Sequence, residues 1–282
     1  MGTEDQAGVM QSTDEIDSAP KALAESKSAE RDSKAGVGEV SSNVYLTPVA
    51  QVARAQIWGQ TVFFTIANPR DVIQGFHSRG KFYEPEELEI IRTFMEPGST
   101  LCDIGANVGN HTIFALKYLR TERVILFEPN PTVIPVLLSN IALNGLANRC
   151  DSSFLGYGLS DETAKGLSIA LKSARNLGGA KMVAGKEGGS LEVIRGDDAL
   201  SGRSVDFLKI DVEGMELKVL TGLSETISLF RPRIFVEVDN SNSMAFREWV
   251  ERFGYRIKAS FRRYRANENF MLVPKRVRHI TS

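Results

Sequence analysis

The chain has 282 residues, of which 42% are hydrophobic and 24% are charged, a composition typical of globular proteins with enough apolar side chains for a sizeable core. Its 34 Lys and Arg nearly balance its 35 Asp and Glu, which argues against nucleic acid as an obligate partner. Two cysteines, Cys102 and Cys150, cannot build a disulfide framework, and the sequence shows neither a run of about 18 apolar residues nor a secretory leader. We therefore expect a cytoplasmic protein that neither spans a membrane nor is secreted.

The first 43 residues differ in composition from the rest. Residues 1–40 hold nine acidic and four basic side chains, a net charge of −5, which leaves about +4 for the remainder. This segment has no aromatic residue and no hydrophobic periodicity, so it cannot bury enough apolar surface to offset its ordering entropy. We predict a disordered acidic tail over 1–43, with a regulatory or partner-binding role left open.

Residues 44–98 are predicted to form strands and a helix that pack on the main domain. The segment QIWGQTVFFTIAN at 56–68 alternates as a hairpin does. Pro85 stands at a first helical position and is followed by two acids, and Leu88, Ile91 and Phe94 then share one face. The sequence Glu-Pro-Gly at 96–98 ends this helix.

From residue 99 onward, short apolar runs alternate with helical stretches. The predicted strands are Thr100–Ile104, Val124–Phe127, Val205–Ile210 and Ile234–Val238, and the predicted helices are His111–Leu119, Pro131–Leu143 and Gly214–Phe230. This alternation favours right-handed crossovers and a mostly parallel sheet. We predict one doubly wound α/β domain over 99–282, closed by an antiparallel C-terminal hairpin of Tyr255–Ser260 and Phe270–Val273.

The segment from Leu101 to Thr112, LCDIGANVGNHT, joins the first strand to a helix, where such sheets bind ligands. Gly105 and Gly109 permit a tight turn and close backbone approach, and Asp103 adds an acid. A dinucleotide fingerprint requires Gly-x-Gly-x-x-Gly, whose second glycine is missing. An acid beside this loop suits a cation better than a pyrophosphate. S-adenosylmethionine carries a sulfonium and an ammonium that Asp103 can attract, while the loop backbone receives its carboxylate.

Two further residues lie near this loop. Glu128 ends the second strand, 25 residues after Asp103, where an acid can accept hydrogen bonds from both ribose hydroxyls; the alternative is an exposed acid that caps the next helix. His111 begins the helix after the loop. It is a candidate general base or a polar residue of the helix cap.

A second charged cluster, Lys209, Asp211 and Glu213, ends the fourth strand. Alternate residues of an extended chain point the same way, so the cluster is predicted to face the transferable methyl group. Methyl transfer to an alcohol requires in-line geometry and removal of a proton. Asp211 or Glu213 can remove that proton or hold the hydroxyl, and Lys209 can orient a carboxylate. The alternative is a structural salt bridge with acids at a helix N-terminus.

Three other segments leave their roles open. Glu237, at the end of the last parallel strand, either lines the same cleft or pairs with an arginine. The glycine-rich segment from Ser173 to Ser190 is read as a loop, either a lid over substrate or a plain insertion. The stretch from Arg256 to Arg278 holds eight Lys or Arg, with Phe261, Tyr264 and Phe270 between them. It is either a solvated surface or a binding site for RNA or an anionic saccharide.

These motifs together resemble the FkbM family of S-adenosylmethionine-dependent methyltransferases. The resemblance covers Glu84 to Pro274 and rests on DIGANVGNHT (Asp103–Thr112), FEPNP (Phe127–Pro131), Asn140 and Asn144, LSD (Leu159–Asp161), KIDVEGMELKVLTG (Lys209–Gly222), RPRIFVEV (Arg231–Val238) and ENFMLVP (Glu268–Pro274). It implies a seven-stranded class I methyltransferase fold and commonly O-methylation of a sugar or other hydroxylated metabolite, without an obligatory metal. It also implies that Asp103, Gly105, Asn107 and Glu128 bind the cofactor and that Asp161 lies by the adenine.

The resulting hypothesis is an S-adenosylmethionine-dependent O-methyltransferase acting on a small-molecule or glycan hydroxyl. Its candidate catalytic residues are Asp211, Glu213, Lys209 and His111. Its candidate cofactor-binding residues are Asp103, Gly105, Asn107, Gly109, Glu128 and Asp161. The alternatives are methylation of nitrogen, RNA or protein, and a non-catalytic cofactor-binding module; a nicotinamide oxidoreductase is disfavoured by the glycine spacing.

Overall fold

A computed structural model describes residues 50–171, 180–184 and 189–275. The predicted tail over 1–43 and most of the predicted glycine-rich loop lie outside these residues. The helices are α1 (Val72–His77), α2 (Pro85–Phe94), α3 (Asn110–Tyr118), α4 (Ile134–Leu143), α5 (Gly196–Ala199), α6 (Glu216–Gly222), α7 (Ser224–Phe230) and α8 (Ser243–Arg252), with short 3-10 turns at Ala147–Arg149 and Asn240–Asn242.

The centre of the fold is a seven-stranded sheet of order β12-β13-β11-β10-β3-β4-β5. Its strands are β3 (Thr100–Ile104), β4 (Arg123–Glu128), β5 (Cys150–Leu155), β10 (Phe207–Ile210), β11 (Arg233–Asp239), β12 (Tyr255–Phe261) and β13 (Asn267–Pro274). Strand β13 pairs antiparallel with both of its neighbours, β11 and β12, and the other pairs in this sheet are parallel. The predicted doubly wound sheet with an antiparallel C-terminal hairpin is therefore confirmed.

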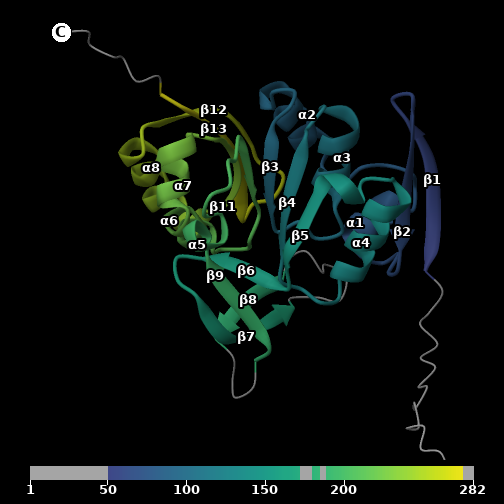
Figure 1. Ribbon diagram of the computed structural model, residues 1–282, viewed down its shortest axis with the longest axis horizontal. Coiled ribbons are helices and arrows are strands. Elements are labelled where there is room, and N and C mark those ends of the chain that lie inside the picture. Colours follow the sequence, from purple (N-terminus) through teal and green to yellow (C-terminus); the bar gives the residue numbers. More distant parts are fainter. Residues whose placement is uncertain (1–49, 172–179, 185–188, 276–282) are drawn as a thin grey trace, which may run out of the picture. The chain divides into compact units, whose positions relative to one another are not determined.

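Helices cover both faces of this sheet (Figure 1). Alternate strand residues point to opposite faces of the sheet. Val124 and Leu126 pack in the core with α2, α3 and α4, whereas Ile125 and Phe127 pack with α6, α7 and α8. This period of two explains why the strands read as continuous apolar runs, because both of their faces are buried.

The N-terminal segment adds the predicted hairpin, β1 (Gln51–Ile57) and β2 (Gln60–Ile66), which pair antiparallel. Val62, Phe64 and Ile66 are buried in the same core cluster as β3 and α3. The predicted helix at Pro85 is also present, and it ends at Phe94. The hairpin and this helix therefore share a core with the sheet.

Two asparagines of α4 join the hairpin to the sheet. The Asn140 side chain is fully buried; its Oδ1 accepts from the Thr65 backbone N–H at 2.6 Å, and its Nδ2 donates to the Val108 carbonyl at 2.7 Å. The Asn144 side chain bonds both backbone groups of Phe63. These hydrogen bonds provide a structural explanation for the asparagines at positions 140 and 144, on which part of the family resemblance rests.

We expect Asn140→Ala to lower the free energy of unfolding by about 2–3 kcal/mol, because it leaves two buried backbone groups without partners. Urea unfolding measures this loss. Asn240→Ala is the matched control, since the side-chain hydrogen bonds of Asn240 are exposed and its loss should cost under about 1 kcal/mol. Equal losses in the two variants would contradict the prediction.

A second sheet of four strands, in the order β6-β9-β7-β8, was not predicted. Its strands are β6 (Tyr157–Ser160), β7 (Ala164–Leu171), β8 (Ala180–Ala184) and β9 (Leu191–Arg195). The prediction of a continuous loop from Ser173 to Ser190 was wrong in part, because β8 pairs antiparallel with β7 inside that segment. Glycines flank β8 in the sequence and concealed the strand.

The single helix predicted over 214–230 is two helices, α6 and α7, separated at Leu223. Leu223 is fully buried and leaves helical geometry with φ −102° and ψ 15°. The carboxylate of Asp197 accepts from the backbone N–H groups of Glu225 and Thr226 at 3.0 and 2.8 Å, so it caps the start of α7. The break depends on a residue far away in the sequence.

The helix predicted to begin at Pro131, α4, begins at Ile134 instead. Asn130 Oδ1 accepts a hydrogen bond from the Thr132 N–H, which forms a turn before the helix.

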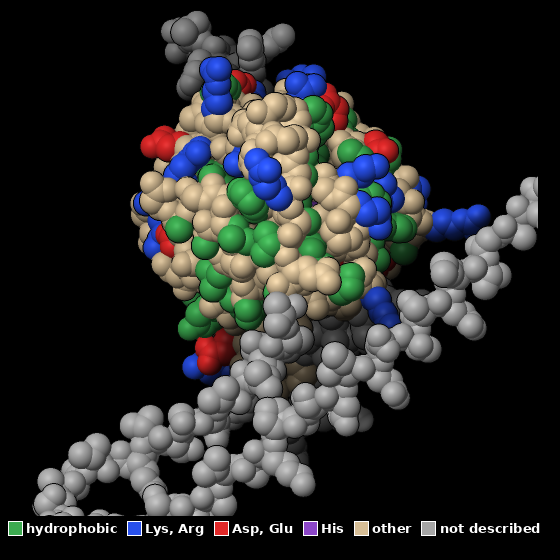
Figure 2. All heavy atoms as spheres, turned by 90° about the vertical axis from the view of Figure 1, so that its right-hand side faces the viewer, with side chains coloured by type: hydrophobic (Ala, Val, Ile, Leu, Met, Phe, Trp, Pro, Cys, Tyr) green, Lys and Arg blue, Asp and Glu red, His purple; other side chains and the backbone are tan. Residues whose placement is uncertain are grey.

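Figure 2 shows the face that carries the hairpin and α4. Hydrophobic side chains lie near its centre, while lysine and arginine side chains are spread toward its rim. The exposed apolar residues of β1 and α4 are Val52, Leu138 and Leu143. Across the described ranges, no helix is both long and apolar enough to cross a bilayer.

Candidate active site

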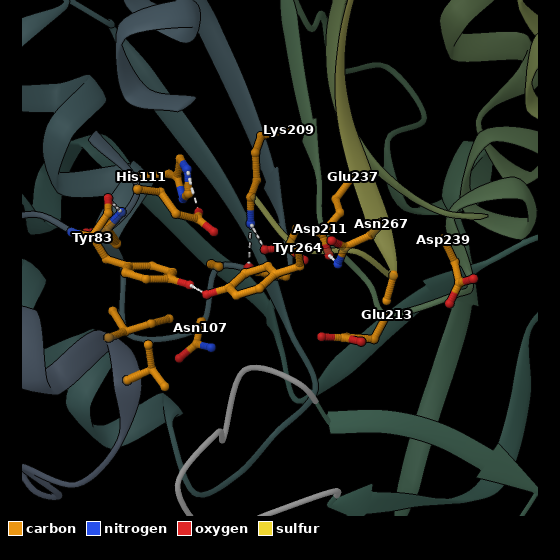
Figure 3. Close-up of a pocket in the computed structure, with 17 residues that line it drawn as sticks. Tyr83, Asn107, His111, Lys209, Asp211, Glu213, Glu237, Asp239, Tyr264 and Asn267 are labelled. Atoms are coloured by element: carbon orange, nitrogen blue, oxygen red, sulfur yellow. Dashed lines mark hydrogen bonds and ion pairs between the residues drawn. The ribbon is translucent and has the colours of Figure 1, made fainter. Parts of the chain in front are cut away.

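A cavity of about 290 Å³ opens at the carboxyl ends of β3, β10 and β11. The strand order reverses between β3 and β10, and doubly wound sheets bind their ligands at this position. Its lining residues are Val72, Ile73, Tyr83, Glu84, Gly105, Ala106, Asn107, Asn110, His111, Lys209, Asp211, Glu213, Glu237, Asp239, Tyr264, Ala266 and Asn267. Figure 3 draws these residues, which come from the strand ends of the sheet and the loops that follow them, from α1 and the segment before α2, from α3 and from the β12–β13 loop.

The loop after β3 lies against the loop after β10. Gly105 has φ +79°, and a Cβ built on it would lie 2.0 Å from the Asp211 carbonyl oxygen. Only glycine fits this approach. Gly109 is the N-cap of α3 with φ 86° and has no side chain to cap the first N–H groups of that helix. An uncapped helix N-terminus beside an open loop suits an anionic group such as a carboxylate.

Lys209 fixes this contact between the two loops. Its side chain is 3% exposed, and its Nζ donates to the Gly105 carbonyl at 2.7 Å. The same Nζ lies 3.4 Å from Asp103 Oδ1 and 3.5 Å from Asp211 Oδ2. Burial disfavours its charged form, but the carboxylates of Asp103, Asp211 and Glu84 outweigh burial and raise the pKa of Lys209 above its usual range. Lys209 is therefore a buried cation that positions the loops.

Two acids predicted to bind the cofactor, Asp103 and Glu128, are buried. Asp103 is fully buried and accepts from Thr112 Oγ1 at 2.6 Å. Glu128 is 6% exposed, and its carboxylate accepts from the backbone N–H groups of Asn107 and Asn130 at 2.7 and 2.8 Å. Burial raises the pKa of Glu128 to about 7, against the effect of these hydrogen bonds. Glu128 thus shapes the loop through Asn107, whose φ of 50° is left-handed.

A histidine and a glutamate lie at the side of the cavity. His111 Nε2 has no hydrogen-bond partner within the described part of the chain and lies 3.7 Å from Glu84 Oε2. Burial, and then the charge of Lys209, lower the pKa of His111 to about 3. With so low a pKa, this imidazole is neutral at physiological pH. Burial, and then the charges of Asp211 and Glu87, raise the pKa of Glu84 to about 8.

The β12–β13 loop closes one side of the cavity. The hydroxyls of Tyr83 and Tyr264 lie 2.6 Å apart and point toward each other (Figure 3). Arg263 Nε donates to Glu87 Oε1 at 2.8 Å, and the same guanidinium bonds Glu86. Arg262 pairs with Glu268. Arg263 therefore holds this loop against α2, whereas the ion pair of Arg262 joins the loop to β13.

The structure brings together the four candidate catalytic residues with Gly105 and Asn107, which all line the cavity. Asp103, Gly109, Glu128 and Asp161 are not among its lining residues. Asp161 Oδ1 accepts from Ser160 Oγ at 3.0 Å and lies 3.9 Å from Lys218 Nζ. Its placement by an adenine and the ribose role of Glu128 stay predictions. Glu237 lines the cavity and accepts from Asn267 Nδ2 at 2.6 Å.

Glu84, Tyr83 and Tyr264 were not predicted as site residues. Glu84 stands at the start of the resemblance, but its local sequence reads as an ordinary helix N-terminus. Tyr264 was noted only as an aromatic among basic residues. No local signal in the sequence identifies these residues, because the segments that hold Tyr83 and Tyr264 are about 180 residues apart and meet only in the folded chain.

We expect the free energy of unfolding to fall as the pH rises from 7 to 8.5. Burial is the first cause that raises the pKa of Glu84 to about 8 and that of Glu237 to about 9. Each carboxyl keeps its proton in the folded state at pH values where the unfolded state, with a pKa near 4.5, has lost it. The folded state then binds more protons, so stability declines as pH rises through this window. The expected decline is on the order of 2 kcal/mol.

Urea unfolding at several pH values measures this slope, and a Glu84→Gln/Glu237→Gln variant should flatten it. Glu89→Gln is the control, because Glu89 is 57% exposed on α2 and pairs with Arg92. A slope in the double variant as steep as in the parent would contradict the assignment.

The sheet order, the glycine loop after β3 and the charged cavity at the switch point define a class I S-adenosylmethionine-dependent methyltransferase. Residues 103–257 match the methyltransferase FkbM domain, more than half of the chain, and the protein belongs to that family. The predicted family, enzyme class and cofactor are thereby confirmed.

Several known proteins are similar to this chain. Hexuronic acid methyltransferase AglP of Haloferax volcanii is 26% identical over 178 residues, which span 61% of this chain and 69% of that protein. Among solved structures, methyltransferase FkbM from Methylobacillus flagellatus matches with a TM-score of 0.44 and 18% identity over 70% of this chain and 52% of its own. The B. subtilis tRNA methyltransferase TrmK matches with a TM-score of 0.45 and 11% identity over 69% and 68% of the two chains.

The residues at the switch point fit S-adenosylmethionine. Asp103 Oδ1 and Asn107 Oδ1 are buried acceptors without a hydrogen-bond partner among the described residues, although Lys209 lies at ion-pair distance from the first. The uncapped start of α3 suits a carboxylate. The cofactor supplies an electrophilic methyl group on a positively charged sulfur. Within the described ranges, no group of three or more His, Cys, Asp or Glu side chains is arranged to hold a metal ion.

Proposed function

We propose that this methyltransferase acts on a hydroxyl of a sugar, a glycan or a similar hydroxylated metabolite. The observation that carries the proposal is the position of Asp211. Its side chain is 36% exposed, it lines the cavity, and its backbone carbonyl abuts the Gly105 loop. A carboxylate there accepts a hydrogen bond from an acceptor hydroxyl and orients its oxygen toward the donor side of the cavity.

The rest of the lining supports a polyhydroxylated acceptor. Tyr83 and Tyr264 contribute hydroxyl groups, and Asn267 and Glu237 contribute an amide and a carboxyl. Such mixed donors and acceptors suit a sugar, which offers several hydroxyls of both characters. The similarity to a hexuronic acid methyltransferase points the same way. Glu213 lies at the cavity edge with φ 46° and remains a candidate second contact to the acceptor.

Methylation of RNA has less support from the described residues. The basic stretch from Arg256 to Arg278 was its motivation, and three of its eight Lys and Arg, namely Arg262, Arg263 and Lys275, form ion pairs with glutamates. Their charge is therefore partly compensated, and little of it is left for phosphate. The expectation that nucleic acid is not the substrate stays a prediction.

Transfer of isotopically labelled methyl groups tests the proposal. The purified protein is incubated with labelled cofactor and either a library of saccharides and glycosides or a cell extract, and products are separated into saccharide, nucleic-acid and protein fractions. We expect alkali-stable methyl ether label in saccharides, lowered at least 100-fold by Asp211→Asn with S-adenosylhomocysteine binding retained. Label confined to nucleic acid, protein or nitrogen atoms would refute O-methylation of a saccharide.

A further inference from the structure

Glu84 has a backbone conformation that its position in the sequence does not require. It is the N-cap of α2 with φ 58° and ψ 53°, and its side chain makes no capping hydrogen bond. A left-handed conformation is costly for a non-glycine residue, and such strain clusters at functional sites. The side chain lines the cavity instead and is 12% exposed. The fold thus presents this carboxyl to the ligand at the expense of the helix cap.

Among the residues that the structure describes, the Glu84 carboxyl forms no hydrogen bond, and its nearest titratable nitrogen is that of a histidine. His111 Nε2, also lining the cavity, lies 3.7 Å from Glu84 Oε2 and has no partner within the described part of the chain. The charged and titratable groups around Glu84 come from every element packed against it: Tyr83 and Glu87 on its own segment, His111 on α3, Lys209 and Asp211 at β10, Glu237 on β11 and Arg263 on the β12–β13 loop.

Asp211 has a different environment. Its carboxylate lies 3.5 Å from the ammonium of Lys209, which also donates to the Gly105 carbonyl, and its side chain is 36% exposed. These contacts hold Asp211 beside the loop after β3. Glu84 is more enclosed and is surrounded by more negative than positive groups. The two carboxyls therefore divide the tasks of holding the hydroxyl and accepting its proton.

We propose that Glu84 is the general base of the transfer and that the charge of the methyl donor ionises it. This inference rests on the proposed function, since it assumes a hydroxyl acceptor. The acceptor oxygen bonds to the methyl carbon while the sulfur–methyl bond breaks with its electron pair going to sulfur, and the hydroxyl proton passes to a Glu84 carboxylate oxygen. Asp211 orients the hydroxyl, and Lys209 keeps Asp211 in place.

The pKa of Glu84, raised to about 8 first by burial and then by Asp211, agrees with this role. At pH 7.5, about three-quarters of such a carboxyl is protonated in the free protein. A positive sulfur in the shared cavity favours the ionised form, so binding of the donor should release the proton. S-adenosylhomocysteine has the same shape without that charge, and it should release less.

Isothermal titration in buffers of different ionisation enthalpy measures the protons released by each ligand. At pH 7.5 we expect S-adenosylmethionine to release about half a proton more than S-adenosylhomocysteine, and we expect the difference to vanish above pH 9.5, where Glu84 is already ionised. Glu84→Gln should abolish the difference and keep the affinity for S-adenosylhomocysteine within about threefold of the parent. Glu89→Gln on the same helix should keep the difference, because Glu89 is exposed outside the cavity.

Equal proton release by the two ligands would overturn the inference, and so would a difference that survives Glu84→Gln but disappears in Glu237→Gln. If Glu84→Gln does not fold, the pH dependence of the difference in proton release between the two ligands, measured on the parent protein, tests the inference.

In the transfer assay on the labelled saccharide fraction, Glu84→Gln should lower the rate about 100-fold or more. An undiminished rate would overturn the base role. Because the calorimetric comparison needs no acceptor, its failure leaves O-methylation standing, whereas normal proton release with label found only on nucleic acid or protein refutes the proposed function.

Discussion

Replacement of Gly105 by alanine should abolish measurable cofactor binding and destabilise the fold by more than about 3 kcal/mol. The new Cβ would lie 2.0 Å from the Asp211 carbonyl oxygen and 3.1 Å from its carbonyl carbon, and backbone atoms cannot rotate away as a flexible side chain does. The φ of +79° adds strain of about 1–2 kcal/mol for any L-residue. Relief of the clash requires the β3 and β10 loops to separate, which opens the switch point where we expect the cofactor to bind.

Gly98→Ala separates the two contributions. Gly98 has nearly the same φ, +81°, but a Cβ there would meet no atom within 4 Å. We expect Gly98→Ala to lose only the 1–2 kcal/mol of backbone strain, measured by urea unfolding, and to bind S-adenosylhomocysteine as the parent does. If the two variants lost stability and affinity equally, the close approach of the loops would not be the reason for Gly105.

Replacement of Lys209 by methionine should cost about 3–5 kcal/mol of unfolding free energy, because it removes the cation beside the fully buried carboxylate of Asp103. The hydrogen bond to the Gly105 carbonyl is lost as well. Loss of the paired charge is the larger effect, since an uncompensated buried ion is far more costly than a missing neutral hydrogen bond. Chemical denaturation measures the change.

Two further variants identify the cause. Lys218→Met is the matched control: Lys218 is 55% exposed and 3.9 Å from Asp161, so its loss should change stability by less than about 0.5 kcal/mol. Asp103→Asn combined with Lys209→Met should recover much of the lost stability, since no buried charge is then left unpaired. A double variant as unstable as Lys209→Met alone would show that Asp103 is not the source of the loss.

The sequence by itself determined the parts of this protein that depend on neighbouring residues. Continuous apolar runs predicted the parallel strands, because a strand buried on both faces must be apolar throughout. The loop of Gly105 and Gly109 could be predicted because a tight strand-to-helix turn requires residues that accept positive φ. Lys209, Asp211 and Glu213 were readable as one cluster, because they follow one another at a strand end.

Only the tertiary structure decided what depends on distant residues. The break between α6 and α7 follows from capping by Asp197, and local helix propensity contains no sign of it. Lys209 was predicted either to orient a carboxylate or to form a structural salt bridge, and only the folded chain shows that it lies between the carboxylates of Asp103 and Asp211. Glu84 became a site residue only when the chain folded, because the proton affinity of a carboxyl is set by desolvation and by the charges around it. Apart from Glu87 on the same helix, those charges come from Lys209 and Asp211 at β10 and from Arg263 on the β12–β13 loop, up to about 180 residues away in the sequence.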